Sequence, residues 1–141
     1  MLGNWAVAGR EEDAITPLEG LKAALGDKTR IVVAKGADID SQDMSGFAEA
    51  VAAARQADAV VMFLGEHPDM SAEANNRTTQ DLPGVQEQLA LQVAATGKPV
   101  VLVLLNGRPL SIGALKGKVP AILEAWFPGV EGGHAITDVL F

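Results

Sequence analysis

The sequence predicts an α/β fold, a three-layer α/β/α sandwich built on a mainly parallel sheet. The runs AVVMFLG at 59–65 and PVVLVLL at 99–105 are apolar throughout, which is typical of strands covered on both faces of a parallel sheet. Segments with helical spacing of apolar residues alternate with these runs, and this alternation indicates a layered α/β domain. The 141 residues match the length of one domain, so 1–141 is expected to be a single α/β-sandwich domain.

The clearest predicted helix lies in ITPLEGLKAALGD, residues 15–27. Thr16 is placed to cap it, Pro17 suits the first helical position, and Glu19 stands three residues after the cap, as a capping box requires. Three leucines then share one face, and Gly26 is expected to end the helix.

The other expected elements follow in order along the chain. They are a strand at 30–34, a helix at 46–58 with Phe47, Val51 and Ala54 inward, a helix at 84–96 marked by Val85, Leu89 and Val93, a strand at 121–126, and a helix at 134–141. The pattern opens on a helix and closes on the apolar pair Leu140 and Phe141. A strand before residue 1 would complete the alternation of strands and helices. We therefore expect that the sequence is cut at both its N-terminal and its C-terminal end.

Composition excludes several classes of protein. The net charge is −7 and the 11 Lys and Arg residues are scattered, whereas nucleic-acid binding needs a concentrated positive surface. The apolar runs are far shorter than the roughly 20 residues that cross a bilayer, so no membrane partner is expected. No signal peptide is visible, and the compartment is unknown, with a periplasmic or secreted parent protein compatible. The chain has no cysteine and therefore no disulfide.

The segment GEHPDMSAEANNRTTQDLP, residues 65–83, is much longer than the usual βα connection of about 2–6 residues. Its titratable residues are Glu66, His67, Asp69, Glu73, Arg77 and Asp81. Two carboxylates such as Glu66 and Glu73 can divide the acid and nucleophile roles of glycoside hydrolysis. Asp81 is expected just before the next helix, where its negative charge interacts favourably with the helix dipole. His67 has no second histidine at ligand spacing, so no metal is predicted.

Two further features have plain structural readings. The glycines of FPGVEGG, 127–133, are expected to permit a tight turn and close helix packing, with an anion site as the less favoured alternative. Trp126 is expected in the core rather than as a sugar platform. The patterns GxGxxG and GxxxxGK[ST] are absent, so no nucleotide and no other cofactor is predicted.

Four stretches, in this order and spacing, resemble the second, α/β-sandwich domain of glycoside hydrolase family 3, the bacterial β-glucosidase type. They are MLGNWAVAGREEDAITPLEGLKAALGD, GEHPDMSAEANNRTTQDLPGVQEQL, GKPVVLVLLNGRPLSI and AILEAWFPGVEGGHAITDVLF. The resemblance implies a two-domain enzyme in which an N-terminal barrel supplies an aspartate nucleophile. The second domain then supplies the general acid/base on a loop that reaches the barrel's site.

The resemblance also implies roles for individual residues. Glu73 matches the acid/base glutamate of the family loop, and Arg77 matches an arginine that follows it. Arg77 is expected to anchor the loop by pairing with a carboxylate, and Glu66 to fix the loop's shape. Met70 is expected either to line the aglycone side or to pack within the loop. Met70, Arg77 and Glu66 are therefore the candidate substrate-binding residues.

The expected function is part of a retaining β-glycosidase acting on terminal β-linked sugars. The partners are then a β-glycoside substrate and the barrel, and the sequence is compatible with a homo-oligomer. The isolated chain is expected to be inactive, with part of its sheet edge or one sheet face exposed. The alternative from another class is a non-catalytic scaffold or carbohydrate-binding module.

Overall fold

The computed structural model describes all residues 1–141 and contains a parallel sheet of three strands in the order β1-β2-β3. The strands are β1 (Val60–Gly65), β2 (Val100–Leu105) and β3 (Ala121–Glu124). Val60 is in register with Val100, and Val101 with Ala121. The predicted fold class and the three strands at 59–65, 99–105 and 121–126 are confirmed.

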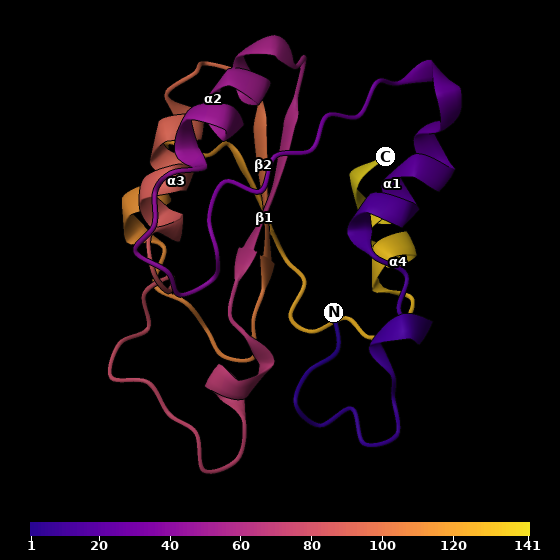
Figure 1. The fold of residues 1–141 in the computed structure, drawn as a ribbon, viewed down its shortest axis with the longest axis vertical. Coiled ribbons are helices and arrows are strands. Elements are labelled where there is room, and N and C mark those ends of the chain that lie inside the picture. The colour runs from indigo at the N-terminus through magenta and orange to yellow at the C-terminus, as the bar shows by residue number, and fades with distance from the viewer.

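The helices are α1 (Pro17–Leu25), α2 (Phe47–Gln56), α3 (Gln86–Ala94) and α4 (Gly132–Leu140). Figure 1 shows α2 and α3 on one side of the sheet and α1 and α4 on the other, which gives three layers. All four helices were expected at these places. None of them is long and apolar enough to cross a membrane.

The main core lies between the sheet and the α2/α3 layer. One face of the central strand β2 supplies Val100, Leu102 and Leu104, all at most 2% exposed. They pack in one cluster with the inward residues of the helices, Phe47, Ala54, Val85, Leu89 and Val93. Burying an aliphatic side chain of this size contributes about 1.5–3 kcal/mol, so this cluster is the rigid base on which the loops at the carboxyl ends of the strands stand.

Helices α1 and α4 pack on each other through glycines. A Cβ placed on Gly20 of α1 would overlap the carbonyl of Gly133 in α4, and it would lie 2.8 Å from Thr137 Oγ1. The expected capping box of α1 is present: the Glu19 N–H donates to Thr16 Oγ1, and the Thr16 N–H donates to Glu19 Oε2 at 2.8 Å. Gly133, in the first turn of α4, therefore serves the close helix packing expected for the glycines of 127–133.

The prediction of a strand at 30–34 is wrong. These residues form no backbone ladder with β1, and the side chains of Val32 and Val33 are 54% and 64% exposed. Only β2 pairs with β1, so the outer edge of β1 is open. The composition of this segment suits a strand, but a strand also needs a neighbour at hydrogen-bonding distance. The exposed sheet edge expected from the sequence is found at the other edge strand, β3, where three of the four residues are exposed.

Two smaller expectations are corrected. Trp126 is 46% exposed and does not belong to the core. Asp81 does not stand at the start of a helix, because α3 begins only at Gln86; instead Asp81 forms a parallel bridge with Ser111. Trp126 lies just after the carboxyl end of β3, and Asp81 lies on the segment that leads from the loop after β1 back to α3.

Candidate functional site

The segment from Gly65 to Pro83 leaves the carboxyl end of β1 and returns to α3. In Figure 1 it is the pink loop that extends beyond the ends of the strands, starting with a short 3-10 helix at Pro68–Ser71. Ligands of open α/β sheets bind at this end of the strands. We call the part 66–71 the outgoing arm, 72–76 the tip, and 77–81 the returning arm.

Glu66 holds the base of this loop together. Its side chain has no exposed surface, and its two oxygens accept from different parts of the chain. Oε1 accepts from Arg77 Nη1 at 2.8 Å, while Oε2 accepts from Ser71 Oγ at 2.6 Å and from the Gly107 N–H at 3.3 Å. One carboxylate thus joins both arms of the loop to the turn that follows β2.

Burial of the Glu66 carboxyl opposes its ionisation, but its partners outweigh that effect. The hydrogen bonds from Ser71, Arg77 and Gly107, with the nearby charge of Arg108, hold the pKa of Glu66 below its usual value of 4.5. A carboxylate that accepts several hydrogen bonds and faces arginines is stabilised in its charged form. Glu66 is therefore an anionic anchor at neutral pH.

Arg77 fixes the returning arm, and the pairing expected for it is confirmed. Besides Glu66, its guanidinium donates from Nη2 to the Asp81 carbonyl at 2.7 Å. The same arm is bound to the segment after β2, because the Ser111 N–H donates to the Gln80 carbonyl at 2.7 Å. The returning arm is thus held by side-chain and backbone bonds alike.

Glu73 lies at the tip and has a different environment from Glu66. Its side chain is exposed and forms no hydrogen bond or ion pair within the chain. The tip is a turn closed by the Asn75 N–H on the Ala72 carbonyl at 3.1 Å, with Ala74 at a φ of 62°. The structure therefore separates the two candidate carboxylates: Glu66 is enclosed in the base, and Glu73 is presented to the outside.

The remaining sequence candidates line the outgoing arm. Met70 is half-buried, and its carbonyl accepts from Arg108. His67 is exposed, with its Nδ1 3.4 Å from the Asp69 N–H, and Asp69 accepts from Asn4 Nδ2 at 2.8 Å. The exposed N-terminal segment thus lies against the outgoing arm.

Sequence reasoning missed two residues that shape the site. Gln86, only 3% exposed, pairs with the end of β1: its Oε1 accepts from the Gly65 N–H at 2.8 Å, and its Nε2 donates to the Gly65 carbonyl at 2.7 Å. Arg108 reaches from the turn after β2 to Ser71 and Met70. The polar NGRP sequence directly after a buried strand was the one signal for Arg108, and Gln86 had none.

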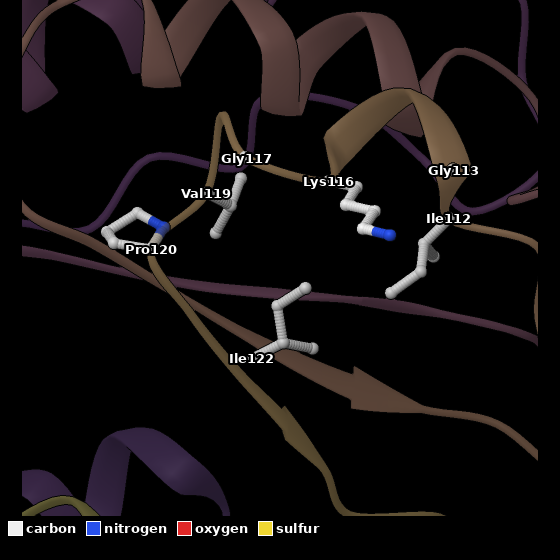
Figure 2. Close-up of a pocket in the computed structure, with 7 residues that line it drawn as sticks. All are labelled: Ile112, Gly113, Lys116, Gly117, Val119, Pro120 and Ile122. Carbon is white, nitrogen blue, oxygen red and sulfur yellow. The ribbon is translucent and has the colours of Figure 1, made fainter.

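Two hollows lie near the sheet. One, of about 200 Å³, is at the carboxyl end of β1 and is lined by Glu66, Gln86, Lys35 and Phe127 among others. The other, of about 330 Å³, is shown in Figure 2 beside the edge strand β3, with Ile112, Val119 and Ile122 around it. Lys116 is its one charged group. No carboxylate lines the hollow beside β3, so this hollow does not contain the carboxylates Glu66 and Glu73.

Comparison with known proteins agrees with this architecture. All of residues 1–141 match the family described as the glycosyl hydrolase family 3 C-terminal domain. The chain is 44% identical to a β-xylosidase of Formosa agariphila over 90% of its length, and 41% identical to a periplasmic β-glucosidase of Salmonella typhimurium over all of it. These matches cover 18% and 21% of the two relatives.

A solved structure gives the same result in three dimensions. A β-glucosidase from Listeria innocua, in complex with isofagomine, superposes with a TM-score of 0.88 at 39% identity. The match covers 99% of this chain and 19% of that one. The chain thus spans about a fifth of the length of the proteins it matches. Family match, sequence relatives and structure together show that this chain belongs to glycoside hydrolase family 3, as its C-terminal α/β domain.

Proposed function

We propose that this domain is part of a retaining β-glycosidase and that its loop 65–83 supplies Glu73 as the general acid/base. The observation that carries the proposal is the contrast within the loop. Buried ionic bonds hold both arms, whereas Glu73 stands on the exposed tip with no partner in its own domain. A carboxyl group placed this way is available to a substrate held by another part of the protein.

The relatives support the reaction class. Several relatives that match the chain are named as β-xylosidases or β-glucosidases, and two are named as exo-α-(1→6)-L-arabinopyranosidases, so all of these names are those of enzymes that release a terminal sugar from a glycoside. Because the chain spans about a fifth of their length, the rest of the active site would come from outside these residues, with the barrel and its aspartate nucleophile as the expected source. The Salmonella relative is named as periplasmic, and a periplasmic or secreted parent protein is consistent with this.

The reaction has two steps in this proposal. First, the nucleophile attacks the anomeric carbon and the bond to the leaving oxygen breaks, while the carboxylic acid of Glu73 gives its proton to that oxygen. In the second step the Glu73 carboxylate takes a proton from water. The water oxygen bonds to the anomeric carbon and displaces the nucleophile. The net result is hydrolysis with retained configuration.

Glu66 and Arg77 support this chemistry from the base of the loop. Because the Glu66 side chain is fully enclosed and the Arg77 side chain is 16% exposed, their part in substrate binding would be indirect, by holding the loop. Met70 is half-buried on the outgoing arm. It is the candidate for a contact on the aglycone side, and packing within the loop is the alternative role.

The test uses the full-length enzyme with Glu73→Ala and two aryl β-glycosides. Phenol is a poor leaving group that needs a proton, and 2,4-dinitrophenol leaves without one. Loss of a general acid should lower kcat/KM on the phenyl glycoside by about 10²–10⁴-fold, with little change on the dinitrophenyl glycoside. An equal effect on both substrates would contradict an acid role for Glu73.

The isolated 141 residues should show no glycosidase activity, because the nucleophile lies outside them. Glu73-dependent hydrolysis by the isolated chain would contradict this part of the proposal. Unchanged turnover of both substrates by the full-length Glu73→Ala enzyme would instead favour the alternative, a non-catalytic scaffold or carbohydrate-binding module.

A further inference from the structure

We propose that Arg108 is a positioning residue for the loop that carries Glu73. It belongs to the NGRP turn after β2, and its guanidinium bonds the outgoing arm of the neighbouring loop. This inference rests on the proposed function and adds a residue to it. Arg108 acts by holding the outgoing arm of the loop and needs no contact with the substrate.

Three contacts connect Arg108 to the outgoing arm. Its Nη2 donates to the Met70 carbonyl, its Nε donates to Ser71 Oγ at 3.2 Å, and the same Nε lies 3.4 Å from Glu66 Oε1. The planar guanidinium group can satisfy several acceptors in one fixed geometry. Of these three contacts, the one with Ser71 is nearest to Glu73 in the sequence, two residues before it.

The turn that carries Arg108 is itself firmly held. Leu104 in β2 and Asn106 after it are at most 2% exposed, and Asn106 Nδ2 donates to the Arg108 carbonyl at 2.7 Å. The Gly107 N–H donates to Glu66, and a Cβ on Gly107 would collide with Ser71. The outgoing arm is thus packed against the turn that directly follows the most buried strand of the sheet.

Charge balance alone does not explain Arg108. Arg77 already neutralises Glu66 through a bond of 2.8 Å, so Arg108 adds a second positive charge around a single buried carboxylate. The Arg108 side chain is 24% exposed, and water can solvate part of that charge. What Arg108 supplies beyond Arg77 is the pair of bonds to Met70 and Ser71.

This position matters because the tip has no side-chain anchor of its own. Arg77 and the backbone bond from Ser111 to Gln80 hold the returning arm. On the outgoing arm, the bonds nearest to Glu73 are those of Ser71 to Glu66 and to Arg108. Without Arg108 the arm would keep its connection through Glu66 but lose its link at Met70 to the turn after β2. The Glu73 carboxyl would then be misplaced relative to the leaving oxygen.

The experiment measures kcat/KM of the full-length enzyme on phenyl and 2,4-dinitrophenyl β-glycosides. In Arg108→Ala, kcat/KM on the phenyl glycoside should fall by about 10²-fold, the cost of a 1 Å misplacement of a catalytic group. The value for the dinitrophenyl glycoside, which needs no proton, should change little. Partial unfolding would lower both values equally, so the ratio of the two reports the position of the acid.

Arg108→Lys covers the case in which the alanine variant does not fold. Lysine keeps the charge but cannot bond Met70 and Ser71 with one rigid fork, so it should also lower the ratio. Guanidinium ion added to Arg108→Ala should restore part of the loss on the phenyl glycoside. Arg55→Lys is the matched control, since Arg55 is exposed on α2 and forms no side-chain bond.

The outcomes separate this inference from the proposed function. If Glu73→Ala changes the ratio but neither Arg108 variant does, the positioning role is refuted and Glu73 keeps its role. A ratio left unchanged by Glu73→Ala overturns the proposed function, and the inference with it. A changed ratio in both Arg108 variants, with Arg55→Lys unaffected, supports the inference.

Discussion

Replacing Glu66 by glutamine removes one negative charge from the base of the loop while keeping the size of the side chain. In the native chain, Oε1 faces Arg77 and Arg108, and Oε2 faces Ser71 Oγ and the Gly107 N–H. An amide has one acceptor oxygen and one donor group. Its NH₂ must therefore meet either the arginines or the Gly107 N–H, and one of these loses its acceptor.

The expected cost follows from these contacts. A hydrogen bond to a charged group contributes about 1.5–3 kcal/mol, and a buried donor without a partner costs about 1–3 kcal/mol. The side chains of Arg77 and Arg108 are 16% and 24% exposed, so water compensates part of the loss. We expect Glu66→Gln to lower the free energy of unfolding by about 2–4 kcal/mol at pH 7.

The effect should also depend on pH. The pKa of Glu66 is lowered from 4.5 in the folded chain, so folding favours the ionised form. Its contribution to stability is complete above pH 4.5 and is lost as the pH falls through the folded pKa. Glutamine does not ionise, so the difference in stability between wild type and Glu66→Gln should shrink below pH 4.5.

The assay is urea unfolding of the 141-residue chain, followed by circular dichroism at pH 7 and at a series of values below pH 4.5. Glu11→Gln serves as the control, because the Glu11 side chain is exposed and unbonded. A loss of less than about 1 kcal/mol, the range of an exposed ion pair, would refute the reasoning. So would a difference between wild type and Glu66→Gln that stays constant with pH.

Two further substitutions test the packing and the exposed tip. Gly20→Ala should lower the free energy of unfolding by about 1–3 kcal/mol, because the added methyl group would overlap the facing helix α4. Gly113→Ala is the control in the same urea assay, since a Cβ at Gly113 meets open space. Equal effects of the two substitutions would contradict the close packing of α1 on α4. Glu73→Gln should change stability by no more than about 0.5 kcal/mol, the usual range for an exposed side chain. A clear loss of stability would mean that Glu73 has a structural partner.

The sequence predicted the parts of the fold that local patterns determine. The capping box of Thr16 and Glu19 can be recognised from a spacing of three residues in the sequence. The two buried strands can be recognised from runs in which every residue is apolar. The long polar loop was identified by its length and its carboxylates. The partnership of Arg77 with a carboxylate was also expected, although its identification came from the resemblance rather than from spacing.

The failures concern contacts between distant residues. Residues 30–34 have the composition of a strand, but no pattern within them shows whether the edge of β1 is within reach. Gln86 looks like an ordinary polar residue at the start of a helix. It is buried because its side chain bonds the backbone N–H and carbonyl of Gly65, which lies 21 positions earlier in the sequence. Arg108 bonds to Ser71 over 37 positions. Such pairs depend on the packing of whole elements, so a single sequence does not reveal them.

The central claim is that Glu73 is the acid/base, and azide rescue tests it most directly. The full-length Glu73→Ala enzyme is given the 2,4-dinitrophenyl β-glycoside with and without azide, and the product is identified by nuclear magnetic resonance. Without the base, water attacks the glycosyl-enzyme slowly, whereas azide needs no deprotonation. We predict that azide raises kcat and that the product is the β-glycosyl azide. Unchanged kcat with azide and no glycosyl azide would contradict the claim, and the acid/base would then have to be sought outside this loop.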